Sequence, residues 1–361
     1  MNRTLLLLAS LVAESAYSAV LLVGPNMPYE LPSEAAMVAE DGDIVEIEAT
    51  VYAGDAAVWT QNDLVIRGVG GRPHIRADGA AAEGKAIWVI KGDNTVIENI
   101  EMSGATVADA NGAGIRLEGT NLTVRGCYFH DNENGILTGP NPDSEVLIEY
   151  SEFANNGYGD GYSHNMYIGR VAKFTLQFSY VHHARIGHQV KSRAVKNEIR
   201  FNRLMDERSG TSSYIIDLPD PGEAFVVGNE MQQGPDADNW AMVHSAQDLQ
   251  LVNNTLVNDR SSGVFVTLSG PSRSSVLQNN LFIGTGRFEA EGAEMRGNLV
   301  IDDGKLADRR GFDYRLTAAS PAIDTGTPVD PTAQLLWEYE HVASRKERED
   351  GGQVDVGAHS Y

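Results

Sequence analysis

The sequence has little of what would cross-link the chain or hold it in a membrane. Cys127 is the single cysteine among 361 residues, so no disulfide can form within the chain. The apolar run Leu5–Ala13 is too short to span a bilayer, and we expect no membrane insertion. Basic residues are also scarce, with 28 Lys and Arg against 50 Asp and Glu, a formal charge of −22. This balance argues against nucleic acid as a partner.

The first eighteen residues have the form of an export signal. Arg3 precedes the apolar run, and Ala16-Tyr17-Ser18 places small residues at the two positions that a signal peptidase reads. We therefore expect residues 1–18 to be a signal peptide and the mature protein to be secreted or periplasmic.

A unit of about 25 residues recurs along the chain. In each unit a polar residue separates two short apolar strands, as in IENIEM and LVNNTL. The polar residues are Asn99, Gly126, Ser151, Ser179, Asn202, Asn229, Asn254, Asn280 and Asn298. Short strands that turn at Asn or Gly with this period are typical of a right-handed parallel β-helix. We predict an all-β, single-stranded, right-handed parallel β-helix of about ten coils, with ladders of stacked asparagine side chains.

The two ends of the chain fit one such domain. Pro32-Ser33-Glu34 begins a short apolar helix, which would cover the open edge of the first coil. The expected divisions of the single domain 19–361 are an N-terminal cap at 19–63, repeat coils at 64–303 and a closing segment at 304–361.

Both ends also resemble known proteins. The helix that leads into Gly42-Asp43-Ile44-Val45 resembles the amino-terminal cap of the pectin-lyase-like superfamily, where a helix leads into a Gly-Asp-x-Val strand. Ser320-Pro321-Ala322-Ile323-Asp324 and Asp355-Val356-Gly357-Ala358 resemble the closing segment of exported bacterial β-helix proteins. The resemblance implies a protein that acts on or binds polysaccharide.

Alignment of the coils places several polar residues on one outward face. Lys191, Asp217 and His244 are expected to project from three successive coils. Tyr167 falls in the neighbouring outward column, diagonally from Lys191, and Gln189 falls in the same column as Tyr167. These residues are candidates for a site on that face.

Positive charge is concentrated just around these residues. The segment 170–203 holds eight of the 28 basic residues and one of the 50 acidic residues, a local charge of +7 against −29 elsewhere. The basic residues are Arg170, Lys173, Arg185, Lys191, Arg193, Lys196, Arg200 and Arg203, with His182, His183 and His188 in the same window. A basic stripe would draw an anionic polymer to one groove, unless these residues occupy several faces of the coils. The Gly- and Tyr-rich stretch Asn155–Asn165, just before the segment, is either a sugar-binding loop or a plain surface bulge.

Val190-Lys191-Ser192, with Asn197 after it, resembles the catalytic strand of β-helix lyases such as chondroitinase B and related alginate lyases. This resemblance implies that Lys191 is the base that removes the proton beside the uronate carboxylate. Other positions of that family are not matched. Asp217-Leu218-Pro219 stands where its catalytic arginine would lie, and Ala184 and Ile186 stand where its calcium-binding glutamates would lie. We therefore expect no cofactor, because calcium is not supported by the residues and no His or Cys cluster has metal-ligand spacing.

His164-Asn165-Met166-Tyr167 is similar to the tyrosine and histidine pairs of other alginate lyases and of mannuronan epimerases. Such chemistry needs a group that neutralises the carboxylate, a base and an acid. In one scheme Lys191 is the base, Tyr167 the acid, and an arginine neutralises the carboxylate. In the other, Asp217 keeps Lys191 charged as a carboxylate clamp, and Tyr167 or His164 is the base. A plain Lys191–Asp217 ion pair is the third interpretation.

The sequence thus predicts an exported, monomeric enzyme that binds an acidic, uronate-containing polysaccharide and catalyses β-elimination or C5 epimerisation. The candidate catalytic residues are Lys191, Tyr167 and His164, and the candidate substrate-binding residues are Arg193, Arg170, Arg185, His188, Gln189, Asp217 and His244. The first alternative is a non-catalytic glycan-binding or envelope-structural β-helix. The second is a glycoside hydrolase, which would need paired carboxylates.

Overall fold

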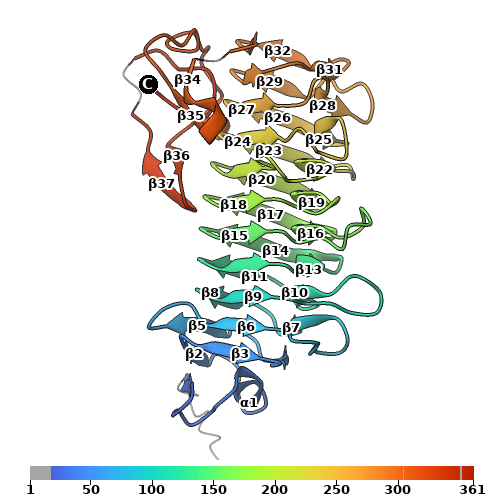
Figure 1. Ribbon diagram of the computed structural model, residues 1–361, viewed down its shortest axis with the longest axis vertical. Coiled ribbons are helices and arrows are strands. Elements are labelled where there is room, and N and C mark those ends of the chain that lie inside the picture. Colours follow the sequence, from blue (N-terminus) through green and yellow to red (C-terminus); the bar gives the residue numbers. More distant parts are fainter. Residues whose placement is uncertain (1–17, 304, 350–351) are drawn as a thin grey trace, which may run out of the picture.

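The computed structural model describes residues 18–303, 305–349 and 352–361, and it shows a column of stacked coils (Figure 1). Residues 1–17 of the predicted signal peptide lie outside the described residues. The short predicted helix is present as α1 (Pro32–Ala36), which lies at the foot of the column and contacts the first strands. No helix within the described ranges is long and apolar enough to cross a membrane.

Three parallel sheets form the walls of the column, and most coils give one strand to each in turn. The ten-stranded sheet contains β4 (Ala57–Trp59), β7 (Ala86–Ile90), β10 (Ala113–Leu117), β13 (Asn134–Thr138), β16 (Met166–Ile168), β19 (Val190–Ser192), β22 (Ile216–Leu218), β25 (Ala241–Ser245), β28 (Val264–Leu268) and β31 (Arg287–Glu289). The twelve-stranded sheet contains β1 (Val20–Val23), β2 (Ile44–Glu48), β5 (Val65–Val69), β8 (Thr95–Glu98), β11 (Leu122–Arg125), β14 (Asn141–Glu149), β17 (Val171–Gln177), β20 (Lys196–Arg200), β23 (Glu223–Val227), β26 (Asp248–Val252), β29 (Val276–Gln278) and β32 (Glu294–Arg296). The eleven-stranded sheet contains β3 (Val51–Ala53), β6 (His74–Arg76), β9 (Glu101–Ser103), β12 (Tyr128–His130), β15 (Glu152–Ala154), β18 (Tyr180–His182), β21 (Arg203–Met205), β24 (Glu230–Gln233), β27 (Thr255–Asn258), β30 (Leu281–Ile283) and β33 (Leu299–Ile301). The predicted all-β parallel helix is confirmed.

The corner between the twelve-stranded and eleven-stranded sheets contains the predicted asparagine ladder. Each side-chain amide donates to the side-chain oxygen of the next asparagine, at 2.9–3.0 Å. The ladder runs through Asn202, Asn229, Asn254, Asn280 and Asn298. Because these amides also donate to backbone carbonyls of the coil below, they satisfy polar groups that water does not reach.

The inward positions of the ten-stranded sheet, among them Ile136, Val190 and Val243, form a continuous apolar core. The predicted outward column beside them is wrong at Gln189, which is completely buried. Its amide nitrogen donates to the backbone oxygen of Met205 at 2.9 Å. Strand β19 begins only at Val190, so the two-residue alternation of a strand does not extend to the corner residue Gln189. Ile215, Met242 and Phe265, each directly before an inward-facing residue on the following coils, are also completely buried.

The segment that follows the coils folds back beside the column (Figure 1). It forms two antiparallel pairs, β34 (Leu306–Asp308) with β35 (Asp313–Leu316) and β36 (Trp337–Glu340) with β37 (Ser344–Glu347), and two 3₁₀ turns at Arg309–Gly311 and Pro331–Ala333. His359 ties it to the coils through a 2.5 Å contact from Nε2 to the Glu230 carboxylate. Although burial opposes the charged imidazole, this carboxylate and that of Glu338 raise the pKa of His359 to about 9. The segment is therefore attached by buried charge as well as by apolar contacts.

Candidate functional site

Four polar side chains form a row on the outer face of the ten-stranded sheet. Tyr167, Lys191, Asp217 and His244 are direct partners on the adjacent strands β16, β19, β22 and β25. The predicted placement of Lys191, Asp217 and His244 on successive coils is confirmed. The predicted diagonal offset of Tyr167 is wrong, because Tyr167 lies directly opposite Lys191. Neighbouring strands are about 4.8 Å apart, so the row extends about 14 Å along the axis of the column.

Asp217 is the centre of this row. Its carboxylate lies 3.3 Å from Lys191 Nζ and 3.3 Å from His188 Nε2, and it accepts a 2.6 Å hydrogen bond from His244 Nδ1. Burial alone would raise the pKa of Asp217, but the hydrogen bond from His244 and the neighbouring His188 and Lys191 hold it at about 2. The carboxylate is therefore ionised at neutral pH and fixes the three groups around it.

Two buried histidines support Asp217 from beneath. His188 Nδ1 accepts the backbone N–H of Tyr214 at 3.2 Å, which leaves the proton of a neutral ring on Nε2, facing Asp217. His164 Nδ1 accepts the backbone N–H of His188 at 3.0 Å, and the two rings stack with centroids 4.6 Å apart. Burial lowers the pKa of His188 to about 4 and that of His164 well below its ordinary value. Both rings are neutral at pH 7.

His164 was predicted as a candidate catalytic base. Only 1% of the residue is exposed, so its ring cannot contact a polymer on the outer face. His188, predicted to bind substrate, is also buried, and its ring contacts Asp217 rather than the open face. Sequence alternation placed these residues near Lys191 but could not distinguish a residue beneath the row from one within it.

Two of the predicted arginines flank Tyr167. Arg193 Nε donates a 2.8 Å hydrogen bond to the Tyr167 hydroxyl oxygen, and its guanidinium also pairs with Asp220. Arg170 lies 3.5 Å from the same Asp220 carboxylate. The structure therefore brings Tyr167, Lys191, Arg193 and Arg170 to one area of the sheet.

The rest of the basic segment is distributed over the other walls, so a single basic stripe is not formed. Arg185 pairs with Asp131, which follows a strand of the eleven-stranded sheet. Lys173, Lys196 and Arg200 surround Glu198 on the twelve-stranded sheet, and Arg203 pairs with Glu230 on the eleven-stranded sheet. The segment is longer than one coil, and successive residues therefore fall on all three faces.

Ser269 lies just after β28, beside the end of the row, and was not predicted from the sequence. Its Oγ lies 2.8 Å from His244 Nε2, so that Asp217, His244 and Ser269 form a continuous hydrogen-bonded series. The strand partner of His244 on the next coil is Thr267, so the coil spacing would not have indicated Ser269.

The histidines and the carboxylate of this row do not bring three ligand atoms within 4.8 Å of one another. Within the described ranges, the one group of three neighbouring potential ligands is His74, Glu101 and His130 on the eleven-stranded sheet.

The tip of the Asn155–Asn165 loop, adjacent to the row in sequence, exposes Tyr158 and Tyr162 at 62% and 86%.

Comparison with known proteins agrees with the fold. Residues 33–166 match the family model described as a right handed beta helix region. The structure is similar to the crystal structure of pectate lyase Pel9A, with a TM-score of 0.68 and 12% identity over 96% of this chain and 97% of that chain. A Geobacillus virus E2 protein, ORF18, is similar at a TM-score of 0.46 and 13% identity, over 72% of this chain and 52% of that one. No curated protein sequence matches the chain.

The family-model match and the similarity to the pectate lyase structure agree with the right-handed parallel β-helix fold that the sequence predicted. At 12% identity the likeness to the pectate lyase establishes the fold and leaves the substrate and the reaction to the residues of the site.

Proposed function

We propose that this protein binds an acidic polysaccharide along the ten-stranded sheet and cleaves it by β-elimination at a uronate residue. The observation that supports this most directly is the adjacent pair Tyr167 and Lys191, with Nζ 5.9 Å from the centre of the tyrosine ring. A proton-transfer group and a cation at this separation can act on one uronate ring. The fold, shared with a pectate lyase, agrees with a polysaccharide substrate.

Lys191 is the carboxylate clamp in this proposal. Asp217 lies 3.3 Å from its ammonium group, and a lysine held in this way donates hydrogen bonds rather than removing protons. Its side chain is 17% exposed, so that the ammonium still reaches the outer face. Neutralising the uronate carboxylate makes the neighbouring C5–H more acidic and stabilises the charge that develops in the transition state.

Tyr167 is the proton-transfer group. As a phenolate it removes the C5 proton, the electron pair of that bond forms the C4–C5 double bond, and the C4–O bond breaks. The tyrosine then returns the proton to the departing glycosidic oxygen. Arg193, whose Nε donates to the tyrosine oxygen at 2.8 Å, stabilises that oxygen while it is negatively charged.

Hydrolysis fits the row less well. A glycosidase needs one carboxylic acid that is still protonated at working pH. The low pKa of Asp217, about 2, excludes it from that role, and Asp220 is paired with two arginines. We therefore favour elimination over hydrolysis.

The reaction is tested by incubating the purified protein with alginate, pectate, chondroitin and a heparin-like polymer, and recording the ultraviolet absorbance of unsaturated uronate ends. We expect absorbance to rise with at least one polymer. Retained binding with no absorbance on any polymer would make this a binding protein instead. Uptake of deuterium from D₂O at C5 without chain cleavage would make it an epimerase.

Two substitutions of Lys191 distinguish the clamp from the base. We expect Lys191→Ala to lower kcat/KM about 10²–10³-fold, the usual cost of losing one charge-stabilising donor. Lys191→Arg should retain well over ten times the activity of Lys191→Ala, because arginine keeps the charge but cannot be deprotonated. If both variants are equally inactive, Lys191 is the base and the clamp assignment is wrong.

A second candidate function is that of an esterase. Ser269, His244 and Asp217 are joined by hydrogen bonds in the same order as the nucleophile, the base and the orienting carboxylate of a catalytic triad. Ser269 lies in an exposed bend, where an O-acyl group of a polymer could reach its Oγ. Ser269 Oγ would attack an O-acyl group of the sugar, pass its proton through His244 to the departing hydroxyl, and be released by water.

A fluorophosphonate probe tests the esterase candidate. We expect it to label the wild type and the control Ser274→Ala, and to leave Ser269→Ala and His244→Ala unlabelled. Equal labelling of Ser269→Ala and the wild type, or no labelling of the wild type, would exclude a reactive Ser269.

A further inference from the structure

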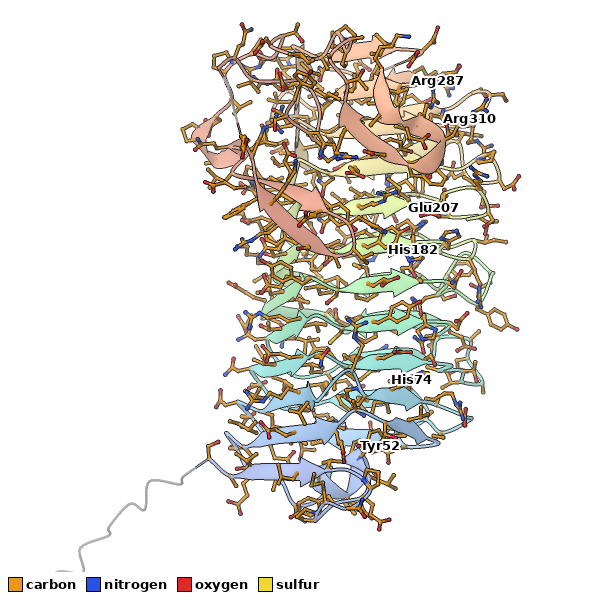
Figure 2. All side chains as sticks on the ribbon, turned by 60° about the vertical axis from the view of Figure 1, so that its left-hand side comes forward. Tyr52, His74, His182, Glu207, Arg287 and Arg310 are labelled. Carbon is orange, nitrogen blue, oxygen red and sulfur yellow. The ribbon has the colours of Figure 1, made fainter. Side chains whose placement is uncertain are left out.

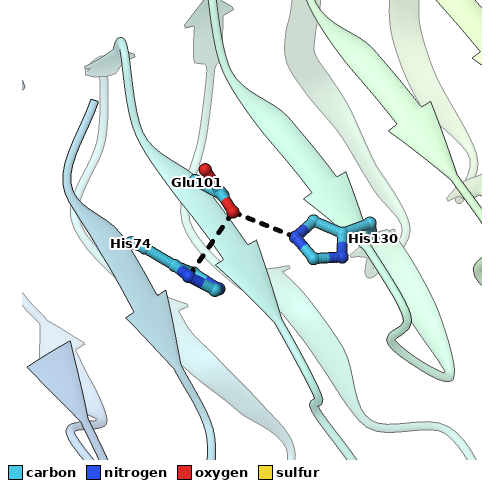
Figure 3. A group of neighbouring side chains, drawn as sticks. All are labelled: His74, Glu101 and His130. Atoms are coloured by element: carbon cyan, nitrogen blue, oxygen red, sulfur yellow. Dashed lines mark hydrogen bonds and ion pairs between the residues drawn. The ribbon is translucent and has the colours of Figure 1, made fainter. Parts of the chain in front are cut away.

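Three side chains converge on the outer face of the eleven-stranded sheet, whereas the row described above lies on the ten-stranded sheet. Figure 3 shows how the three side chains meet. His74 and Glu101 are direct partners on β6 and β9, and His130 lies on β12, the next strand. The Glu101 Oε1 atom lies 3.4 Å from His74 Nδ1 and 3.1 Å from His130 Nε2. One donor atom from each residue lies within 4.8 Å of the other two. We infer that His74, Glu101 and His130 bind a divalent transition-metal ion, with Zn²⁺ as the best fit.

The separations match those of a zinc site. Zinc bonds to histidine nitrogen and carboxylate oxygen are about 2.0–2.2 Å, so that donors at tetrahedral angles lie about 3.3 Å apart. The separations of Glu101 Oε1 from the nitrogens of His74 and His130 are 3.4 and 3.1 Å. Two imidazoles and one carboxylate are also a donor set that transition metals prefer over calcium or magnesium, which select oxygen ligands.

The far side of each imidazole is held by a hydrogen bond. His74 Nε2 lies 2.7 Å from Ser103 Oγ, and His130 Nδ1 lies 2.8 Å from the Asp131 carboxylate. A partner on the outer nitrogen fixes the tautomer and the ring orientation, and a carboxylate there makes the imidazole a stronger ligand. Asp131 is in turn paired with Arg185. In this inference Arg185, which was predicted to bind substrate, instead holds the carboxylate that orients His130.

The site is accessible to an ion from solution. The three side chains are 18–26% exposed, and His130 is further fixed by the Tyr128 ring, stacked at 4.4 Å. Water would complete a four-coordinate ion, since the protein supplies three ligands. A bound ion would join three successive coils of the column.

The same sheet contains an incomplete copy of the arrangement. His182 Nε2 lies 3.2 Å from the Glu152 carboxylate, and the Tyr180 ring stacks on His182 at 4.0 Å, repeating the geometry of Glu101, Tyr128 and His130. The strand partner of Glu152 on the preceding coil is Tyr128, where Glu101 has His74. His74 and His182 lie on the same side of the column (Figure 2). The copy therefore lacks the partner that His74 gives Glu101. Its second histidine, His183, lies 2.7 Å from the outer nitrogen of His182. The copy serves as a matched control.

The test uses untagged full-length protein stripped with EDTA and titrated with Zn²⁺ by calorimetry. We expect one site of micromolar or tighter Kd, no heat from Ca²⁺, and a thermal midpoint that rises with Zn²⁺. His74→Gln and His130→Gln should weaken binding at least about 100-fold and abolish the rise, whereas His182→Gln should change neither. Asp131→Asn should weaken binding about 10–100-fold.

Two results would overturn the inference. One is wild-type protein that binds no Zn²⁺, and the other is a loss of binding in His182→Gln as large as in His74→Gln. Circular dichroism and the midpoint of metal-free protein show whether each variant is folded. The readouts are independent of polysaccharide cleavage, so failure of the lyase proposal leaves this test intact, and the converse also holds.

Discussion

Tyr167→Phe is expected to lower the rate of polysaccharide elimination about 10³-fold, within the range that general acid–base groups contribute. The substitution removes the hydroxyl group and retains the ring that packs near Lys191. Polymer binding should stay close to wild type, because the carboxylate clamp and both flanking arginines remain. The decrease should therefore appear in kcat, with KM nearly unchanged.

The measurement is the initial rate of absorbance increase on whichever polymer the wild type cleaves. Tyr162→Phe is the matched control, since this tyrosine is 86% exposed on the neighbouring loop and should retain full activity. Tyr167→Phe within tenfold of the wild type would show that another group transfers the proton, and our assignment of the site would be wrong. Equal losses in both variants would place the reaction at the loop.

The fold could be predicted from the sequence because its signal is repeated. Each coil has the same local requirement, a polar or glycine residue at the corner and apolar residues pointing inward, and a period near 25 residues appears even where single strands are only three residues long. The row of Lys191, Asp217 and His244 followed for the same reason, since each is the middle or later residue of a short strand that begins with a buried aliphatic or alanine residue.

The sequence did not determine the register of strand β16 or which polar side chains near the row are buried. The Asn155–Asn165 insertion lengthens one coil, and β16 begins at Met166, directly after it. Tyr167 is therefore the direct strand partner of Lys191, whereas the alignment of the coils places it in the neighbouring column. Corner residues such as Gln189 turn inward because their amides satisfy buried carbonyls, a requirement that depends on the neighbouring coil. The position of His164 beneath His188 is likewise decided by stacking between coils.

The group on the eleven-stranded sheet, which also spans three coils, was not found from the sequence. His74, Glu101 and His130 are separated by 27 and 29 residues, and no local motif joins them. Their proximity arises because one coil is about that long, so that such positions become neighbours when the coils stack. In a β-helix, ligand spacing should therefore be searched at the coil period as well as at the short spacings of helices and loops.

Asn229→Ala is expected to destabilise the column by about 3–5 kcal/mol, because it leaves several buried polar groups without partners. The Asn229 amide nitrogen donates to the side-chain oxygen of Asn254 at 2.9 Å and to the Ile199 carbonyl at 2.8 Å. Its side-chain oxygen accepts from both the backbone and the side chain of Asn202, each at 3.0 Å. Asn229 is completely buried, so that water cannot replace these hydrogen bonds without entering the core.

Equilibrium unfolding in urea measures this effect as a lower midpoint with an unchanged slope, which would mean that the surface exposed on unfolding is the same. Asn62→Ala is the control. Its amide hydrogen-bonds to Asp41 at 3.2 Å on the exposed surface, where water replaces the lost partner, and we expect a change below about 1 kcal/mol. Asn62 also bonds with its side chain across neighbouring coils, to Asp41 and from the backbone of Asp93, so the contrast tests whether the large loss is specific to the buried ladder. A loss at Asn229 as small as that at Asn62 would mean that inward stacking of apolar residues alone sets the stability of the column and that the ladder only selects the corner geometry.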